Sequence, residues 1–509
     1  MKLRRPTIGF WCVVAVSIVY WTCAGLRAAY RPFWYDELVT WHIARLPNVA
    51  AMWAANLSGA DNNMLLSHLF VRFSQALFGP GYLATRLPAL LGFWIMLLAL
   101  YIFLRRRLPV PFALIGMVFP MLTFAWPYAF EARAYGIVLS CAGIALVAWQ
   151  NAVDGRARRI SLVALATALA VALACHPFAV LLAVPFGLGE VVRSIERRRI
   201  DWPVWLSFAA AAPLTLLYPM VVAPTVTIDL HGLQPGYSDL PGFYDAALKT
   251  AITPLLGAGA AAYLLLRLFP HHHADEEVKN TFPSQEAAAL LGFAVAPALL
   301  ICVMMASTNM VLFARYGLIC VIGLAGFVAL MLFRMARGSR RAGWVMFAIV
   351  AAWLTMARSR EAKSGALDPH AQFEERVPVL ARALADGRPV VTDDPLLLAE
   401  SDFYESDAAV QRLYYVKFDI PRRYPWRDWC DRLVESCQRV IPLRAHAEQW
   451  QTFSRRYEQF LLYSGGTRQW IYDALLEGGW QVTLVSHQGQ DSLYEVRAPA
   501  GRGLQGALR

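Results

Sequence analysis

Two adjacent carboxylates, Asp36 and Glu37, are the residues of this chain best suited to chemistry. They lie in the stretch RPFWYDELVT, directly after an apolar run over residues 8–29. An acidic residue at the end of such a run is costly unless it faces water, a partner or a substrate, so it suggests a functional site. The alternative is a solvated interfacial pair, against which the flanking Trp34 and Tyr35 weigh. We therefore predict that Asp36 is a catalytic group and that Glu37 assists it.

The composition indicates what kind of chain positions this pair. Of the 509 residues, 58% are hydrophobic and only 16% are charged. The apolar residues form runs of about the length that crosses a bilayer, which excludes an ordinary soluble protein. The formal net charge is +11, but the basic residues cluster between apolar runs, which is how membrane orientation is encoded. We therefore predict a polytopic membrane protein that binds no nucleic acid.

The apolar runs predict about eleven transmembrane helices. They cover residues 8–29, 87–104, 109–129, 135–152, 160–176, 177–193, 203–223, 247–268, 287–306, 316–334 and 343–357. The first run follows a basic start and lacks a convincing cleavage site, so it predicts a retained signal anchor with a cytoplasmic amino terminus. Basic clusters then fall on alternate turns, as the positive-inside rule requires, although the turn at His271–His273 has a poor basic bias.

The composition changes after residue 357, where charged and aromatic residues become frequent. Four runs are typical of strands, and a helical pattern precedes the last of them. The runs are RPVVTDD, RLYYVKF, QFLLYSG and WQVTLVS, and the helical pattern is RQWIYDALLEGG. We therefore predict a transmembrane domain over residues 1–357, whose outer loop 31–86 carries the acid pair, and a soluble α/β domain over residues 358–509. An odd number of spans places this domain outside the cytoplasm, on the side of Asp36.

Cys430 and Cys437 are the only cysteines of the predicted soluble domain. A disulfide between them would agree with an oxidising compartment. If both lie on one unbroken helix, however, their α-carbons are roughly 10 Å apart, too far for a bridge. The sequence leaves the two readings open.

The outer loop carries an ordered series of motifs. After the acid pair comes an amphipathic stretch, LVTWHIARLPNVAAMWAANL, which fits the membrane surface. The polar turn Asp61-Asn62-Asn63 then leads into a helix with His68, and Phe78-Gly79 and Arg86-Leu87-Pro88 follow. This order resembles the GT-C glycosyltransferases, and among them the protein O-mannosyltransferases, the lipid A aminoarabinose transferases and their bacterial cousins.

Two later motifs extend the resemblance, and one position departs from it. EARAYG from Glu131 and ARYGL from Ala314 are similar to two further signatures of these bacterial cousins. Many relatives have a proline pair or a His-Pro just after the Asp/Asn turn, where this chain has Met64-Leu65. The departure concerns the acceptor side of the pocket.

The resemblance implies a GT-C fold and a reaction. Such an enzyme transfers a sugar from a polyprenyl-phosphate carrier to a glycan, lipid or protein acceptor outside the cytoplasm. Asp36 resembles the family's catalytic aspartate and would act as general base, because an acceptor hydroxyl is a weak nucleophile. Glu37 would orient the acceptor or a metal ion. The bacterial cousins further imply an inner (plasma) membrane location, with the carboxyl-terminal domain in the periplasm.

The remaining candidate residues would bind the two substrates. A lipid phosphate that leaves with negative charge calls for fixed cations, and the planar guanidinium suits phosphate. The candidates for the carrier phosphate are Arg86, Arg133 and Arg315, with Tyr135 and Tyr316 as hydroxyl donors. The candidates for the sugar or acceptor are Asp61, Asn62, His68 and His176. No His, Cys, Asp and Glu spacing matches a tight metal site, and a requirement for Mg²⁺ or Mn²⁺ stays open.

Each of these residues also has a structural reading. An arginine at the end of a span usually anchors the helix at the headgroups. Glu131 is better read as a partner that holds Arg133 than as a catalytic acid, and a lone histidine is more often structural. These readings compete with the functional ones, as the solvated interfacial pair does for Asp36 and Glu37.

Two other functions fit a multi-span chain with outer arginines. One is a transporter or flippase of lipid-linked sugars, because membrane carboxylates can relay protons. Against it, the sequence shows neither duplicated halves nor two broken helices at matching positions. The other is a partner in envelope assembly without catalysis, which mutation of Asp36 would separate from an enzyme.

Overall fold

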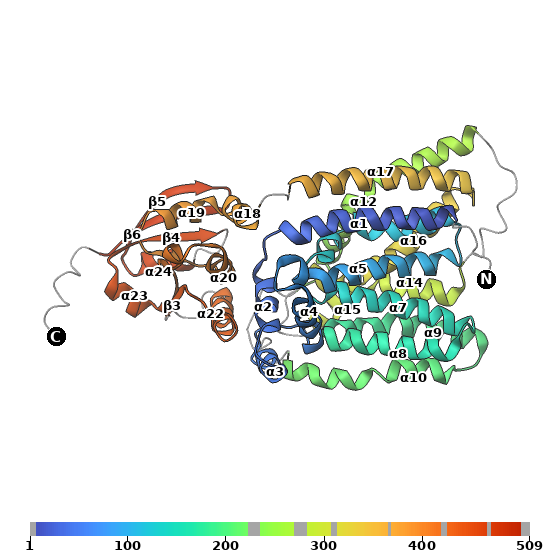
Figure 1. Cartoon of the computed structure of the whole chain (residues 1–509), viewed down its shortest axis with the longest axis horizontal. Coiled ribbons are helices and arrows are strands. Elements are labelled where there is room, and N and C mark those ends of the chain that lie inside the picture. Colours follow the sequence, from blue (N-terminus) through green and yellow to red (C-terminus); the bar gives the residue numbers. More distant parts are fainter. Residues whose placement is uncertain are drawn as a thin grey trace. The chain divides into compact units, whose positions relative to one another are not determined.

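The computed structural model describes residues 7–221, 235–268, 282–306, 313–364, 368–418, 425–465 and 470–499. The predictions for the basic start of the chain and for His271–His273 lie outside these residues. The described residues form two packed units (Figure 1). The helical unit takes those within Met1–Ala29, Asn62–Val226 and Gly232–Ala366, and the mixed unit takes those within Tyr30–Asp61, Thr227–His231 and Leu367–Arg509.

The helical unit is a bundle of apolar helices. Its helices are α1 (Ile8–Tyr30), α4 (Leu65–Phe78), α5 (Tyr82–Arg105), α6 (Val110–Val118), α7 (Tyr135–Val153), α8 (Arg158–Cys175), α9 (Ala183–Arg197), α10 (Trp202–Ala209), α12 (Asp239–Leu268), α14 (Ser284–Ala294), α15 (Ala296–Met305), α16 (Cys320–Met335) and α17 (Arg340–Ser364). Short 3₁₀ turns connect or extend them: η1 (Phe119–Leu122), η2 (Trp126–Ala129), η3 (Pro177–Leu182), η4 (Ala212–Leu217) and η5 (Ala314–Gly317).

The described helices agree with the predicted spans. Eight of them, counted with their 3₁₀ extensions, are long and apolar enough to cross a membrane, and α14 with α15 makes a ninth that is bent by 48°. Two shorter apolar helices, Val110–Leu122 and Cys320–Met335, lie at the two remaining predicted positions. The bend follows from Pro297 in the first turn of α15, because proline cannot continue the hydrogen bonding of α14.

Glycines let α5 and α7 approach closely. A β-carbon on Gly136 would lie 2.4 Å from the carbonyl oxygen of Ala89, and one on Gly92 would lie 2.4 Å from the carbonyl oxygen of Gly136. Small residues at helix crossings allow this contact between backbones within a membrane bundle. Gly136 is the last residue of the EARAYG motif, so the glycine of that motif is needed for the close packing of α5 against α7.

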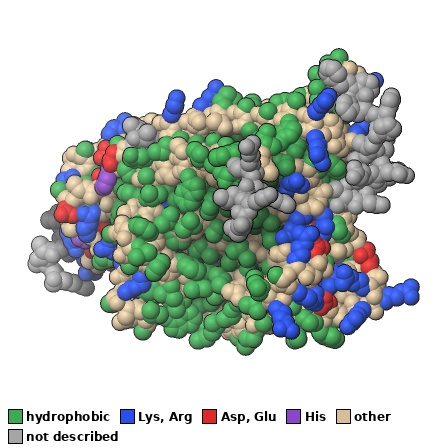
Figure 2. Space-filling view, turned by 45° about the vertical axis from the view of Figure 1, so that its right-hand side comes forward, with side chains coloured by type: hydrophobic (Ala, Val, Ile, Leu, Met, Phe, Trp, Pro, Cys, Tyr) green, Lys and Arg blue, Asp and Glu red, His purple; other side chains and the backbone are tan. Residues whose placement is uncertain are grey.

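One end of the helical unit carries the predicted basic clusters. Hydrophobic side chains form a broad band over the unit in Figure 2, and Lys and Arg gather beside this band together with some Asp and Glu. Arg107, at the end of α5, pairs with Glu286 at 2.5 Å and with Asp154 at 3.1 Å. This ion pairing joins the ends of α5, α7 and α14. We call this end the basic end.

The mixed unit is built on a six-stranded sheet. The strand order is β3-β2-β1-β4-β6-β5. Its strands are β1 (Val390–Thr392), β2 (Leu413–Lys417), β3 (His446–Gln449), β4 (Gln459–Gly465), β5 (Gln481–Gln488) and β6 (Asp491–Arg497). The first four pair in parallel, with Val391 opposite both Tyr414 and Leu462, whereas β6 pairs antiparallel with β4 and β5.

Helices complete the mixed unit. They are α2 (Tyr35–Ala44), α3 (Val49–Leu57), α18 (Pro369–Arg376), α19 (Pro378–Ala385), α20 (Pro395–Tyr404), α21 (Asp407–Val410), α22 (Pro425–Gln438), α23 (Trp450–Arg456) and α24 (Trp470–Glu477). The four strand-like runs of the sequence form β1, β2, β4 and β5, which confirms the predicted α/β domain. Cys430 and Cys437 are free thiols on α22.

The predicted outer loop 31–86 is divided between the two units. Its first part, Tyr30–Asp61, packs with the carboxyl-terminal residues, and the rest belongs to the helical unit. Helix α2, which carries the acid pair, packs against α20. The domain boundary at residue 357 stays a prediction, and α17 continues past it to Ser364.

Candidate functional site

The acid pair lies in the first turn of α2, where the two carboxylates have different surroundings. Carboxylates are favoured there because the helix dipole is positive at its amino terminus. Glu37 is fully buried, and its Oε2 accepts a hydrogen bond of 3.5 Å from the Trp34 amide. This contact caps the helix in the manner of an N3 glutamate. Asp36 is only half-buried, so it is the more accessible of the two.

The start of α2 is held by α20. The Tyr35 amide donates to Oε1 of Glu400 at 2.9 Å, and the Phe33 amide donates to the Tyr404 hydroxyl at 2.5 Å. The first amides of a helix have no partner within the helix, so the bond from Tyr35 satisfies a group that needs one. Glu400 also pairs with Arg376. The orientation of Asp36 therefore depends on residues of the carboxyl-terminal domain.

Tyr35 links Asp36 to a second predicted residue, Asp61. Burial raises the pKa of Tyr35 well above its usual value of 10, and the nearby Cys437, Asp36 and Asp61 raise it further. Asp61 is itself buried. The predicted base and a predicted substrate-binding carboxylate are therefore both near enough to Tyr35 to raise its pKa.

Four predicted residues of the helical unit come together at the end opposite the basic end. His176, which follows α8, has its ring centroid 5.1 Å from that of Tyr135 and 6.3 Å from that of Tyr316. Its Nδ1 accepts a hydrogen bond of 3.2 Å from the Phe178 amide. The Arg315 guanidinium carbon lies 5.8 Å from the centre of the Tyr316 ring. We call Tyr135, His176, Arg315 and Tyr316 the aromatic cluster.

Aromatic rings orient the cation of this cluster. The guanidinium carbon of Arg315 also lies 4.4 Å from the centre of the Phe313 ring, and Tyr316 stacks on Phe178 at 4.2 Å. A guanidinium over an aromatic face is attracted by the ring and keeps hydrogen-bond donors at its edge. The cluster therefore combines an oriented cation with two phenols and an imidazole, which is a set of groups suited to a phosphate or a sugar.

The other predicted arginines occupy different surroundings. Arg86 is fully buried in α5, and its Nη1 donates to the Ala28 carbonyl at 2.9 Å, near the carboxyl end of α1. This bond gives Arg86 a clear structural role, because the last carbonyls of a helix lack partners. Arg133 is nearly buried in the turn between η2 and α7, where its amide donates to the Glu131 carbonyl at 2.7 Å.

The two remaining candidates differ in exposure. His68 is fully buried in α4, whereas Asn62 is exposed just before that helix. Burial fits a structural histidine, and exposure leaves Asn62 open to a ligand. The substrate-binding roles of both stay predictions.

A further charged group, which the sequence analysis did not single out, joins three segments of the helical unit. Glu361 on α17 accepts a hydrogen bond of 3.0 Å from the Trp126 indole and pairs with Arg358 at 2.5 Å and with Arg27 at 3.8 Å. Arg358 lies 5.1 Å from the centre of the Trp126 ring. The only sequence signal was the presence of arginines at the ends of the first and last spans.

The described ranges contain no group of three or more His, Cys, Asp and Glu that is placed to hold a metal ion. The question of a divalent ion therefore stays open.

Comparison of this structure with solved structures identifies similar folds. No protein-family model matches the sequence, and no curated protein does. The structure of ArnT from Cupriavidus metallidurans bound to undecaprenyl phosphate is similar over 96% of this chain and 98% of that chain, with a TM-score of 0.52 and 13% sequence identity. The apo state of ArnT from the same organism covers 95% of this chain and 97% of its own, with a TM-score of 0.51 and 13% identity. The chain therefore has the predicted GT-C fold, with its helical membrane unit and its carboxyl-terminal α/β domain.

Proposed function

We propose that this chain is a membrane glycosyltransferase that transfers a sugar from a polyprenyl-phosphate carrier to an acceptor, with Asp36 as general base. The observation that supports it most strongly is the fold shared with ArnT over nearly the whole chain, in a structure that holds undecaprenyl phosphate. The same likeness favours a transferase over a flippase or an inactive assembly partner.

Asp36 has the properties that a base requires. An acceptor hydroxyl loses its proton as the glycosidic bond breaks, so a carboxylate must reach that proton. Asp36 is half-buried at the amino end of α2, whereas Glu37 is buried and caps the same helix. We therefore assign proton transfer to Asp36 and positioning of its helix to Glu37, in place of the predicted contact of Glu37 with acceptor or metal.

The cations of the helical unit fit the leaving group. The carrier phosphate gains negative charge as the sugar departs, and fixed donors stabilise such charge. We assign this role to Arg315 and Arg133, with the hydroxyls of Tyr135 and Tyr316 as further donors. Arg86 contributes less directly in this proposal, because one arm of its guanidinium already binds α1.

The location follows from the charge pattern. The basic clusters lie at one end of the bundle, and the positive-inside rule assigns such an end to the cytoplasm. We propose a bacterial inner membrane, a cytoplasmic amino terminus and a periplasmic carboxyl-terminal domain. Transfer then takes place on the periplasmic side.

The test is transfer of a labelled sugar from polyprenyl-phosphate-sugar to a pool of acceptors, in membranes that contain matched amounts of each variant. We expect Asp36→Asn to lower transfer by about 10²- to 10⁴-fold, the range for a general base. The control is Asp386→Asn, which removes a surface carboxylate of the same unit that pairs with Arg388 and should leave transfer unchanged.

Two results would contradict the proposal. Equal transfer by wild type and Asp36→Asn would remove Asp36 from the chemistry. Carrier movement across vesicles by the wild type, without transfer to any acceptor, would instead establish a flippase.

A further inference from the structure

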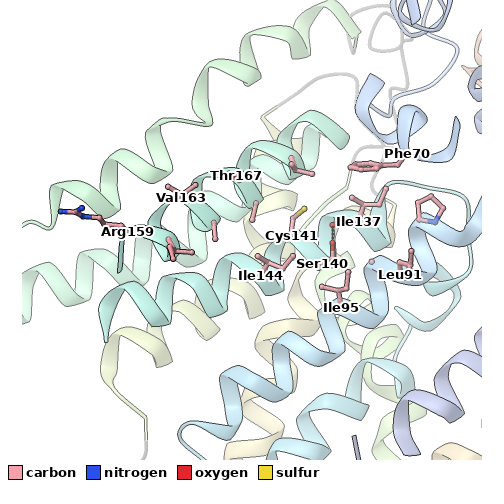
Figure 3. A pocket seen from close by; sticks show the side chains of 16 residues that line it. Phe70, Leu91, Ile95, Ile137, Ser140, Cys141, Ile144, Arg159, Val163 and Thr167 are labelled. Carbon is pink, nitrogen blue, oxygen red and sulfur yellow. Dashed lines mark hydrogen bonds between the residues drawn. The ribbon is translucent and has the colours of Figure 1, made fainter. Parts of the chain in front are cut away.

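An apolar groove runs along the helical unit between α5, α7 and α8, with α4 at one end. Its volume is about 780 Å³, and Figure 3 shows its lining side chains from Arg159 at one end to Phe70 at the other. The volume lies within the range of small-molecule sites. Ile160 and Val163, on the α8 wall, are mostly exposed in the described structure, so this wall faces the surroundings of the bundle.

The length of the groove along α8 is close to the thickness of one leaflet of a bilayer. On α8 its lining runs from Arg159 to Val171, which is roughly 18 Å at the helical rise of 1.5 Å per residue. The hydrocarbon core of a bilayer is about 30 Å thick, so one leaflet contributes about 15 Å. A single extended hydrocarbon chain therefore matches the groove in length.

The walls fit hydrocarbon. The lining is mostly aliphatic, with Leu91, Ile95 and Ile144 among its side chains. Ser140, one of the few polar lining residues, donates its hydroxyl to the Ile137 carbonyl at 2.7 Å. Because this hydroxyl already has a hydrogen-bond partner in its own helix, an apolar occupant leaves no buried polar group without a partner there.

Arg159 is an available cation at one end of this groove. Its neighbours in the same turn are paired: Arg158 with Asp201 at 2.5 Å and Arg156 with Asp154 at 3.8 Å. Arg159 is exposed and makes no hydrogen bond or ion pair with any residue that the structure describes. An apolar channel that ends at such a guanidinium is complementary to a lipid with a phosphate headgroup.

We infer that this groove binds one acyl chain of an anionic phospholipid, whose phosphate lies against Arg159. The site is separate from the proposed transfer site, because Arg159 and His176 lie near opposite ends of α8. That helix has 18 residues, so its ends are roughly 26 Å apart. A carrier phosphate must reach the aromatic cluster to react, so a lipid held at Arg159 is a bound phospholipid and not the sugar donor.

Native mass spectrometry of the full chain in mild detergent tests this inference. The probes are phosphatidylglycerol, phosphatidylcholine and undecaprenyl phosphate, each titrated separately. We expect one phosphatidylglycerol to bind at least tenfold more tightly than phosphatidylcholine. Arg159→Ala should weaken phosphatidylglycerol binding at least tenfold. Arg156→Ala is the matched control, because it removes a cation of the same turn outside the groove, and should change nothing.

A second variant tests the groove itself. Val163→Trp fills the channel from the exposed wall of α8 and should abolish the tight binding of phosphatidylglycerol, while the melting temperature without lipid stays that of the wild type. Equal binding by wild type and Arg159→Ala would overturn the inference. So would tighter binding of undecaprenyl phosphate that Arg159→Ala weakens, since the groove would then belong to the carrier. None of these measurements depends on sugar transfer, so a failure of this inference can be distinguished from a failure of the proposed function.

Discussion

The two ends of the helical unit hold their arginines in different ways. At the basic end, Arg107 pairs with buried Glu286, and Arg193 pairs with Glu190 and with Asp201. At the opposite end, Arg315 lies over the rings of Phe313 and Tyr316. Carboxylates hold the first set, and aromatic faces orient the cation of the second.

Under the proposed function, this difference separates residues that stabilise the fold from residues that act on substrate. A guanidinium bound to buried carboxylates is neutralised and joins the helices that carry the partners. A guanidinium on an aromatic face is oriented by the ring and is not neutralised by it. The backbone follows the same division, because the aromatic cluster draws on the 3₁₀ turns η3 and η5 as well as on helix ends. Irregular segments on a rigid scaffold are where binding groups usually lie.

The sharpest test of the basic end is Glu286→Ala. It leaves the Arg107 guanidinium without its buried partner, and breaking a buried pair costs about 3–5 kcal/mol of unfolding free energy. Thermal unfolding in detergent should show the loss, while transfer per folded molecule stays near that of the wild type. Asp154→Ala, at the more exposed arm of the same network, should cost clearly less. An unchanged melting temperature for Glu286→Ala would contradict a stabilising role for this end.

The corresponding test of the aromatic cluster is Arg315→Ala. Loss of one preoriented donor typically lowers turnover by about 10²-fold, and we expect little change in melting temperature. Steady-state transfer kinetics measure the effect. Arg267→Ala is the control, because Arg267 lies 5.2 Å from the Tyr263 ring outside the cluster. A variant with normal kcat/KM would remove Arg315 from the proposed site.

Glu361 is an exception to this division. It pairs with Arg358 and Arg27, yet these arginines lie at the ends of α17 and α1 that are away from the basic end. Its side chain is 30% exposed, so we expect Glu361→Gln to cost only about 1–2 kcal/mol. If Glu361 contributes both to stability and to sugar transfer, the Glu361→Gln variant should have a lower melting temperature and a lower transfer rate. A change in stability alone would place it with the basic end.

The mixed unit has its own cation on an aromatic face, and it affects a histidine. Burial, together with the nearby positive charge of Arg45, lowers the pKa of His42 from 6.5 to about 4. The guanidinium carbon of Arg45 lies 4.1 Å from the centre of the Trp41 ring. Because the unfolded chain binds more protons than the folded chain between pH 4 and 6.5, stability should fall as the pH drops through this window.

The expected loss is about 1 kcal/mol between pH 7 and pH 5.5. Denaturant unfolding at a series of pH values measures it, and His42→Gln should flatten that part of the profile. If the variant keeps the wild-type slope, His42 does not cause it.

Much of the helical unit could be predicted from the sequence, because long apolar runs have few alternatives to crossing a membrane. The strands β1, β2 and β4 could be predicted for a related reason, because they are buried and their sequences are short apolar runs. Strand β3, with the sequence HAEQ, lies at the sheet edge and is partly exposed, so it has no such signal. The packing of Tyr30–Asp61 with the carboxyl-terminal domain depends on contacts between distant residues, which local patterns do not encode.

The sequence predicted at which end of the bundle the candidate residues lie, but not which contacts they make there. Counting spans placed Tyr135, His176 and Arg315 at one end of the bundle, and the structure brings them together. Arg86 shows the limit of this reasoning. A cation at the end of a span is equally suited to a ligand phosphate and to the last carbonyls of a neighbouring helix, and only the structure reveals its bond to Ala28.

The bond between Tyr35 and Glu400 joins residues 365 positions apart, which has a consequence for biosynthesis. A ribosome that adds about 5–20 residues per second delivers Glu400 roughly 20–70 s after Tyr35. During this interval the helix that bears Asp36 lacks its anchor. Under the proposed function, the nascent chain therefore stays inactive until its carboxyl-terminal domain has been translated, and we expect a truncated translation product to show no transfer of lipid-linked sugar.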